Sequence, residues 1–236
     1  MSNLRHIAVL IPARDEEELL PRCLESVVAA TSMLPRTVSC DIVVAVDRST
    51  DRTREIAEQM LRGYGEVVCC NAGIVGQARA HAARIALARY RGSPDLCWLA
   101  NTDADCIVPN TWLIDQLSLA GDTVQAVAGT IDVDSFAEHL LGVEDLFHTT
   151  YLIHPDGTHP HVHGANLGVR ASAYTQVGGW APLRTAEDHD LWNRLCRADC
   201  TRLSAAWLKV TTSGRRIGRA PHGFAEALAA HNEAVA

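Results

Sequence analysis

The stretch "CWLANTDADCIVP", Cys97–Pro109, carries an apolar run directly into two aspartates and then into a proline. A short continuous apolar run is typical of a strand that is buried on both faces of a sheet. Asp103 and Asp105 follow this run, and residues two apart in an extended segment point to the same side. The stretch therefore predicts a buried strand with two carboxylates presented together at its carboxyl end.

The same order of apolar run and helical segment occurs three times upstream. The apolar runs are "HIAVLIP", "CDIVVAV" and "EVVCC", at 6–12, 40–46 and 66–70. The segments between them, and the Ala-rich segment 76–92, have the apolar period of a helix. We expect Pro21 to lie in the first turn of the first helix or to kink it. This alternation predicts an α/β fold with a mostly parallel central sheet flanked by helices.

The carboxyl ends of these strands are the expected ligand-binding edge, because ligands of open parallel sheets bind beyond those ends. The rule points to four short segments, 13–16, 47–51, 71–77 and 102–106. No GxGxxG follows the first strand and no GxxxxGK[ST] occurs anywhere. The sequence therefore lacks both the dinucleotide-binding and the P-loop fingerprints.

The second half of the chain alternates less regularly. We expect a strand at 123–134, a helix at 135–152, a loop rich in His, Pro and Gly at 153–164, and an amphipathic helix at 186–200. The C-terminal part is first basic and then helical. A length of 236 residues fits a single domain with a sizeable core, which we take as residues 1–236.

The composition argues against two classes of function. A net charge of −7 is unfavourable for nucleic-acid binding, which needs clustered Lys and Arg, although it does not exclude a small anionic ligand. No apolar run approaches the roughly 20 residues of a transmembrane helix. The eight cysteines form no CxxC pair and no secretory signal opens the sequence. We therefore expect reduced thiols and a cytoplasmic location, with peripheral contact to a membrane left open.

The two aspartates after the fourth strand suit a hard divalent cation. Mg²⁺ and Mn²⁺ prefer oxygen ligands and are commonly held by one or two carboxylates together with substrate phosphates. A helix N-cap and turn is the alternative interpretation of Asp103 and Asp105. Asp47 ends the second strand in the same way, where it could contact a ribose or a base, or cap the following helix.

Six segments together resemble the family 2 glycosyltransferases, which have the GT-A fold. They are "VLIPARDEE", "VVAVDRSTDRT", "GQARAHAARIALA", "NTDAD", "HGANLGVRASAYTQVGGW" and "AEDHDLWNRL", in that family's order and approximate spacing from about Ile7 to Arg197. The resemblance implies a Rossmann-like, mostly parallel sheet with a smaller acceptor-side sheet region. It also implies a nucleotide-binding half at about 1–106 and an acceptor-binding half at about 107–236.

The resemblance further implies a UDP- or GDP-sugar donor, Mg²⁺ or Mn²⁺, and inverting transfer to an acceptor hydroxyl. It places these residues at the donor nucleotide: Pro12, Ala13, Arg14, Glu16, Asp47, Gly76, Arg79 and Asp103. It places the metal on Asp105 and Asp103. The chain has Val46–Arg48 where the family often has two aspartates and a glycine, and Ala80 where it often has asparagine. These departures leave uridine and guanosine both open.

Glu187 and Asp188 match the family's acidic pair and open a predicted helix. The match implies that Asp188 is the general base that takes the acceptor's proton, with Glu187 as a ligand of the acceptor. Acids in the first turn of a helix also interact favourably with the helix dipole. That structural role is the alternative explanation for the pair.

The segment before this pair is implied to contact the sugar and the acceptor. Gly164, Ala165 and Asn166 resemble the family's small-residue stretch beneath the sugar, and a packed strand is the alternative. His163 belongs to a histidine-rich loop at the same place. For that loop, contacts to the acceptor or diphosphate, a solvated surface and a zinc site all remain open.

The basic C-terminal segment supplies the remaining candidates. Arg215 and Arg216 could close over the diphosphate, or belong to a solvated tail. In proteins with this fold a histidine near the C-terminus often completes the metal shell, and His222 is the candidate here.

The sequence thus predicts an inverting, metal-dependent glycosyltransferase. A nucleotidyltransferase is the first alternative, disfavoured because no GxGxR-type loop follows the first strand. A non-catalytic nucleotide-sugar-binding protein is the second. The acceptor could be a small molecule, a glycan or a lipid carrier, and the oligomeric state, including a homodimer, is open.

Overall fold

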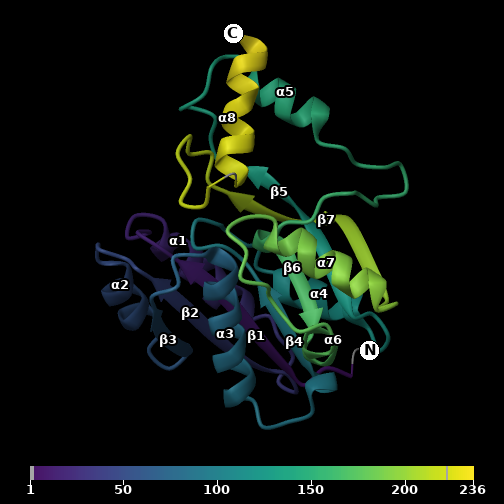
Figure 1. Cartoon of the computed structure of the whole chain (residues 1–236). Helices are drawn as coiled ribbons and strands as arrows, with labels where there is room; N and C mark the ends of the chain where they lie inside the picture. The colour runs from purple at the N-terminus through teal and green to yellow at the C-terminus, as the bar shows by residue number, and fades with distance from the viewer. Residues whose placement is uncertain (1–2, 222) are drawn as a thin grey trace.

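A computed structural model describes residues 3–221 and 223–236 of the chain. Within them, seven strands form one sheet in the order β3-β2-β1-β4-β6-β5-β7 (Figure 1). The strands are β1 His6–Ala13, β2 Ser39–Asp47, β3 Gly65–Cys70, β4 Cys97–Asn101, β5 Ala126–Val133, β6 Leu167–Arg170 and β7 Arg202–Thr212. β6 is antiparallel to both of its neighbours, and the other paired strands are parallel. The predicted α/β architecture with a mostly parallel sheet is confirmed.

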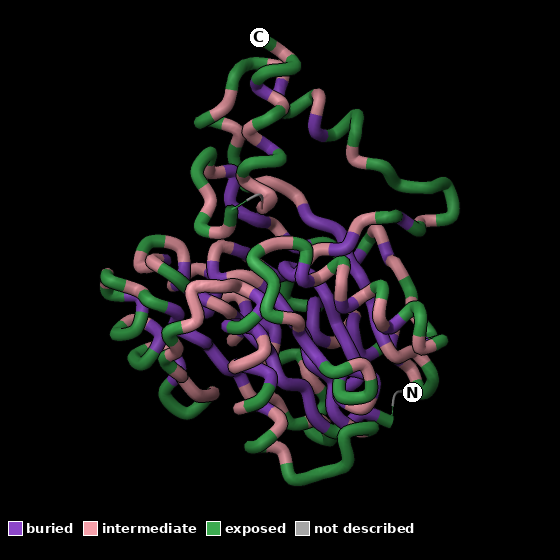
Figure 2. Tube along the Cα trace, viewed as in Figure 1, coloured by how far each residue is buried: buried purple, intermediate pink, exposed green. Residues whose placement is uncertain are grey.

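Helices cover both faces of this sheet. α1 Leu20–Thr31, α2 Thr53–Met60 and α4 Trp112–Ala120 pack on one face, and α3 Val75–Arg89, α6 Ala171–Gln176 and α7 Glu187–Arg197 pack on the other. Two short 3₁₀ helices, Pro94–Leu96 and Gly164–Asn166, precede β4 and β6. The buried residues run along the strands between the two helical layers (Figure 2).

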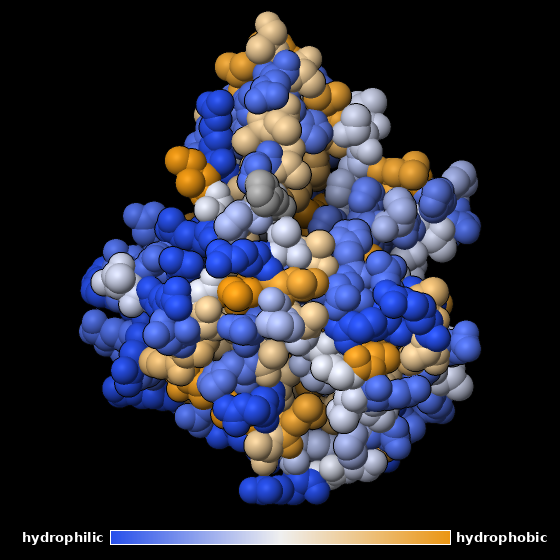
Figure 3. Space-filling view, in the orientation of Figure 1, coloured by the Kyte–Doolittle hydropathy of each residue, from blue (hydrophilic) through white to orange (hydrophobic). Residues whose placement is uncertain are grey.

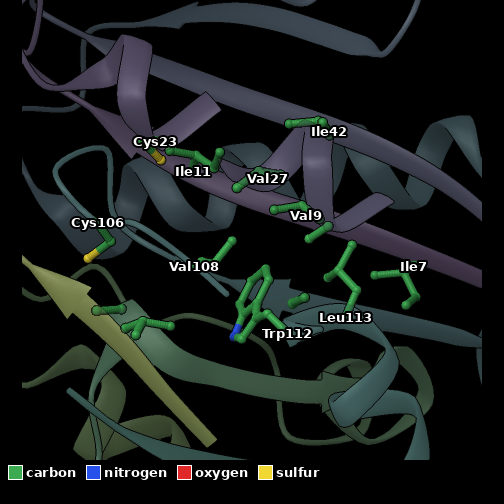
Figure 4. Close-up of a cluster of buried hydrophobic side chains, with 14 of the residues drawn as sticks. Ile7, Val9, Ile11, Cys23, Val27, Ile42, Cys106, Val108, Trp112 and Leu113 are labelled. Carbon is green, nitrogen blue, oxygen red and sulfur yellow. The ribbon is translucent and has the colours of Figure 1, made fainter. Parts of the chain in front are cut away.

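Each face of the sheet has its own apolar core because successive strand residues point to opposite faces. In β1, Ile7 and Val9 contribute to the core under α1, whereas Ala8 and Leu10 contribute to the core under α3. Figure 4 shows the first core, where Trp112 of α4 lies among apolar side chains from the strands and from α1. This arrangement leaves the carboxyl ends of the parallel strands at one edge.

Two helices project beyond that edge. α5 Val143–Thr150 and α8 Phe224–Val235 pack together at the top of Figure 1 around Val143, Phe147 and Leu228. Apolar (orange) groups flank this projection in Figure 3, whereas the body below it is mostly hydrophilic. Of the described residues, no helix is long and apolar enough to cross a membrane.

Several predicted elements differ from the structure. The first helix begins at Leu20 with Pro21 in its first turn, which is the first of the two positions expected for that proline. The helix predicted at 135–152 is present only as α5, because Gly142 adopts φ 95° and the preceding segment is tied to other parts of the chain. In that segment, His139 hydrogen-bonds the carbonyl of Gly214 at 2.8 Å.

Sequence reasoning did not predict β7. Its buried positions are Ala205, Leu208, Val210 and Thr212, so the two-residue alternation slips by one residue between the first two. The slip coincides with a bulge where β5 and β7 pair, between Gly129 and Thr130. The partner of β5 moves from Ala205 to Lys209 across this irregularity, so three residues of β7 are inserted there and the periodicity by which strands are recognised is interrupted.

Candidate active site

A cavity of about 810 Å³ opens at the carboxyl ends of β1, β2 and β4, the edge at which the sequence places a ligand. Most of the predicted site residues line it: Pro12, Ala13, Arg14, Glu16, Asp47, Arg79, Asp103, Asp105, His163, Gly164, Ala165, Glu187, Asp188 and Arg215. Gly76, Asn166 and Arg216 do not line it, and His222 lies outside the described residues. Segments from both halves of the chain therefore meet around one space.

Side-chain to main-chain hydrogen bonds fix the floor of the cavity. The N–H of Glu16, after β1, donates to Thr53 Oγ1 at 2.7 Å. Asp47, the last residue of β2, accepts hydrogen bonds from the N–H groups of Ala72 and Gly73 at 2.7 and 2.8 Å. These bonds hold the loops after the first three strands against one another, so Glu16 and Asp47 have defined positions.

A buried arginine joins the two halves of the site. Arg79 of α3 is 2% exposed, and its guanidinium lies 2.6 Å from Asp103 and 3.1 Å from Glu187. Burial lowers the pKa of Arg79, but these carboxylates raise it by more, so the side chain remains charged. A Cβ atom at Gly164 would collide with the guanidinium, so the close approach requires glycine.

Glu187 and Asp188 are adjacent in α7 but have different partners. Glu187 is 6% exposed and paired with Arg79; burial raises its pKa and Arg79 opposes that shift. Asp188 instead accepts main-chain hydrogen bonds, from the N–H of Gly164 to Oδ2 at 2.8 Å and from the N–H of His189 to Oδ1 at 2.7 Å. Asp188 therefore faces the cavity as a carboxylate held in place without a direct ion pair among the described residues.

Arg215 reaches across the floor from the segment after β7. Its two terminal nitrogens donate to both carboxylate oxygens of Glu16, at 2.9 and 2.7 Å. One of them also lies 2.8 Å from Asp105 Oδ2. Burial raises the pKa of Asp105 to about 6, and the charge of Arg215 opposes that shift. Arg215 is thus a cation placed between two carboxylates of the cavity floor.

The residues after β4 can hold a divalent cation. Ligand atoms of Asp103, Asp105 and Cys106 lie within 4.8 Å of one another. Arg79 contacts Oδ1 of Asp103 and Arg215 contacts Oδ2 of Asp105, which leaves one oxygen of each carboxylate outside these ion pairs. Burial raises the pKa of the Cys106 thiol well above its ordinary value, so the thiolate is not available. Two carboxylate oxygens fit Mg²⁺ or Mn²⁺ that takes its other ligands from phosphate and water.

The histidine-rich loop reaches the cavity through His163. The rings of His159, His161 and His163 are stacked in series, with centroids 5.8 and 5.9 Å apart. His159 Nε2 bonds the carbonyl of Ala128 at 3.1 Å, and His161 Nε2 bonds that of Leu152 at 3.0 Å. His159 and His161 are therefore held within the fold by main-chain carbonyl groups, whereas His163 lines the cavity.

Three predicted residues have other contacts. The amide nitrogen of Asn166 donates to the carbonyls of Thr130 and Leu208, and its oxygen accepts from Trp112 Nε1 at 2.9 Å, so this side chain joins β5 to β7. Gly76 packs against the carbonyl of Ala181. The side chain of Arg216 is exposed.

Comparisons with known proteins now identify the family. Residues 8–178, most of the chain, match the family described as Glycosyl transferase family 2. The chain belongs to this family. Among curated proteins, a search finds no match.

Solved structures agree with the family 2 assignment at the level of the fold. S. aureus TarS in complex with UDP-GlcNAc superposes with a TM-score of 0.66 at 15% identity, covering 93% of this chain and 61% of that one. The mannosyltransferase PcManGT from Pyrobaculum calidifontis, in complex with GDP-Man and Mn²⁺, superposes with a TM-score of 0.62 at 18% identity, covering 96% and 68%. The predicted GT-A fold is confirmed. The chain spans about three-fifths of the TarS fragment, 61% of its length.

The cavity is also lined by residues that were not predicted from the sequence. Thr212 and Ser213 line it at the end of β7, and Ile131 lines it near the end of β5. The strand-end rule would have found the first two if β7 had been predicted. Phe224, at the start of α8, lines the cavity as well, and no signal in its sequence context marks it.

Proposed function

We propose that this family 2 protein transfers a sugar from a nucleotide-diphosphate sugar to an acceptor hydroxyl, with inversion, and that the reaction depends on a divalent metal. The observation that carries the proposal is the arrangement of two kinds of carboxylate around one cavity. Asp103 and Asp105 lie at the end of β4, and Asp188 faces the same space from α7.

The donor would lie along the floor of the cavity. Pro12–Glu16 and Asp47 would contact the nucleoside, since they follow β1 and β2 at the ligand-binding edge. UDP-GlcNAc and GDP-Man are the donors in the complexes of TarS and of PcManGT, so UDP- and GDP-sugars are the donors to test first. Arg215 would contact the diphosphate, because its guanidinium lies on the floor beside Asp105.

Asp103 and Asp105 would hold Mg²⁺ or Mn²⁺, which when bound supplies positive charge to the departing diphosphate. Arg79 would keep Asp103 in position from behind, because its guanidinium is buried and paired with Asp103 and Glu187. In this assignment Glu187 neutralises Arg79 and helps to orient the start of α7, next to the acceptor.

Asp188 would act as general base. The acceptor oxygen forms a bond to the anomeric carbon, its proton passes to the Asp188 carboxylate, and the diphosphate leaves with the electron pair of the broken bond. A single displacement of this kind inverts the anomeric configuration. The hydrogen bonds from Gly164 and His189 support this role, because they fix the carboxylate without placing a cation on it.

A thermal-shift panel of UDP-, GDP- and dTDP-sugars, with and without Mn²⁺, tests the proposal. A ligand at 100 times its Kd stabilises the native state by about 2.7 kcal/mol, which corresponds to a rise in Tm of about 5 to 10 °C for a chain of this size. We expect such a rise with one nucleotide class and a smaller rise when Mn²⁺ is omitted. No shift with any nucleotide in the presence of Mn²⁺ would refute the proposal.

Product analysis separates the remaining classes. Inverting transfer releases the nucleoside diphosphate and gives a product with the opposite anomeric configuration. Release of pyrophosphate would indicate a nucleotidyltransferase instead. Binding with no turnover against any hydroxyl, water included, would indicate a non-catalytic nucleotide-sugar-binding protein.

A further inference from the structure

Tyr151, directly after α5, contacts the cavity wall from behind and does not line the cavity itself. Its hydroxyl lies 2.9 Å from Nε2 of His163. The same hydroxyl accepts a hydrogen bond from the N–H of Ile131 at 3.2 Å. Burial raises the pKa of Tyr151 to about 12, so the hydroxyl keeps its proton. Tyr151 is therefore a neutral phenol placed between a main-chain donor and an imidazole.

Counting protons assigns the direction of the bond to His163. A phenol has one proton, and the N–H of Ile131 cannot accept it. Among the described residues, Nε2 of His163 is the acceptor found for that proton. If His163 carried its proton on Nε2 instead, the buried hydroxyl of Tyr151 would be left without an acceptor, which is costly. The contacts thus favour His163 with Nε2 as acceptor and its single proton on Nδ1.

Packing holds this pair in one orientation. The ring of His161 stacks on that of Tyr151 with centroids 3.9 Å apart, and Phe147 contacts it at 5.2 Å. Phe224 meets the ring of His163 edge to face at 6.4 Å. Burial lowers the pKa of His163 to about 4, although Asp188 opposes that shift, so the imidazole is neutral. A neutral imidazole carries a single proton, so the tautomer of His163 is determined by the group that hydrogen-bonds Nε2.

The free nitrogen of His163 belongs to the acceptor side of the cavity. His163 lines the cavity, and the next residue, Gly164, donates its N–H to Oδ2 of Asp188. Among the described residues, no hydrogen-bond partner is found for Nδ1 of His163. A proton on Nδ1 would thus be offered beside the carboxylate that is proposed to remove the acceptor's proton.

We propose that Tyr151 is a positioning residue that holds His163 in its Nδ1–H tautomer, so that His163 donates a hydrogen bond to the acceptor oxygen while Asp188 takes the proton of the same hydroxyl. This inference rests on the proposed function. The two contacts define the direction of the attacking oxygen, since one lone pair accepts from Nδ1–H and another remains for the anomeric carbon. Tyr151 contributes to orientation of the acceptor and not to donor binding.

The test compares the wild-type protein with Tyr151→Phe, which removes the hydroxyl and keeps the ring that stacks on His161. Long-range ¹H–¹⁵N correlation spectra report the histidine tautomers, and His163→Asn assigns the signal of His163. Water serves as the acceptor probe, in hydrolysis of whichever UDP- or GDP-sugar gives the largest thermal shift with Mn²⁺. Tyr64→Phe, at a tyrosine that is 49% exposed, is the matched control.

We expect the Nδ1–H tautomer in the wild type and the Nε2–H or a mixed tautomer in Tyr151→Phe. Hydrolysis by Tyr151→Phe should fall about tenfold in kcat, the size of one hydrogen bond, while the KM for the donor stays within about twofold. The side-chain amide of asparagine lies near the position of Nδ1 of histidine, and it does not need Tyr151 to present an N–H there. We therefore expect kcat of the double variant His163→Asn, Tyr151→Phe to be little lower than that of His163→Asn alone.

Two results would overturn the inference: an Nε2–H tautomer in the wild type, or an unchanged tautomer and unchanged turnover in Tyr151→Phe. The spectra are interpretable without any substrate. Failure of the proposed function is therefore a separate result, seen when the wild type neither binds nor hydrolyses any nucleotide sugar. In that case His163 would have no role toward an acceptor, whichever tautomer the spectra show.

Discussion

The strand-end floor of the cavity and its α7 wall both present carboxylates, but the partners of these carboxylates differ. On the floor, Asp103 is paired with Arg79, and Asp105 is paired with Arg215. On the wall, the carboxylate of Asp188 is held by main-chain N–H groups. Each of the two floor carboxylates has one oxygen outside its ion pair, so the two together could hold a cation. Asp188 has no direct ion pair among the described residues, so its carboxylate is the one placed to receive a proton from an acceptor.

The largest effect should come from removing the base on the wall. In Asp188→Asn we expect kcat for transfer or donor hydrolysis to fall by about 10² to 10⁴-fold, the usual contribution of general base catalysis. The Kd of nucleotide with Mn²⁺, measured by calorimetry, should stay within about threefold, because the donor contacts the floor. Asp190→Asn, two residues further along α7, is the matched control.

If Asp188→Asn keeps its transfer rate while Glu187→Gln loses it, the roles of the two acids are reversed. The base would then be the acid that is paired with Arg79, and the assignment of that role to Asp188, which has no such pair among the described residues, would be wrong.

The next largest effect concerns the arginine that joins floor and wall. Arg79→Met would leave Asp103 and Glu187 close together without their shared cation, and breaking a buried ion pair costs about 3 to 5 kcal/mol. Urea denaturation should show this as a loss in the free energy of unfolding. Arg54→Met, which breaks an exposed i,i+4 pair with Glu58, should cost much less, because exposed pairs contribute little to stability. Equal effects of the two variants would show that Arg79 does not join the two halves.

A smaller effect is expected from the cation on the floor. Arg215 shares Asp105 with any metal bound there, so Arg215→Met should raise the affinity for Mn²⁺ alone about three- to tenfold, as measured by electron paramagnetic resonance. The same variant should bind UDP or GDP with Mn²⁺ more weakly, because the cation near the diphosphate is lost. Arg62→Met, at an exposed arginine, controls for the change in net charge. Unchanged Mn²⁺ affinity would mean that Arg215 and the metal do not compete.

The floor and the wall also differ in how far the sequence predicts them. The floor follows from regular strands whose carboxyl ends must lie at one edge, so Asp47, Asp103 and Asp105 could be placed together from the sequence. Their arginine partners could not be assigned in this way. Arg215 is 199 residues from Glu16, and no local pattern connects residues so far apart.

The wall was harder to predict because tertiary contacts decide its side chains. Asn166 lies in the segment that resembles a sugar site, yet its amide bonds the carbonyls of Thr130 and Leu208. Tyr151 has no motif of its own, and its position behind His163 depends on where α5 ends. Acceptor-side residues of this kind are visible only in the folded chain.

The smallest effect is the contribution of His163, on the wall, to the pH dependence of stability. The pKa of His163 is about 4 in the folded chain, below its ordinary value of 6.5, so the unfolded chain binds more protons between these two values. Stability therefore rises with pH across that window, and His163 has no such effect above it. At pH 5.5, which is one unit below the pKa of His163 in the unfolded chain, the free energy of unfolding should be about 1 kcal/mol lower than at pH 7.5.

His163→Asn should lose this share of the pH dependence, since asparagine does not titrate. Urea denaturation at pH 7.5, 6.5 and 5.5 gives the slope of the free energy of unfolding against pH for the variant and for the wild type. The difference between the two slopes is the contribution of His163, because groups present in both proteins contribute equally to each. Asp188, His159, His161 and His189 are the charged or titratable groups that act on His163 and are present in both. Parallel slopes would show that His163 can be protonated in the folded chain. A protonated ring could not accept a hydrogen bond from Tyr151, so the tautomer assigned to His163 would then be wrong as well.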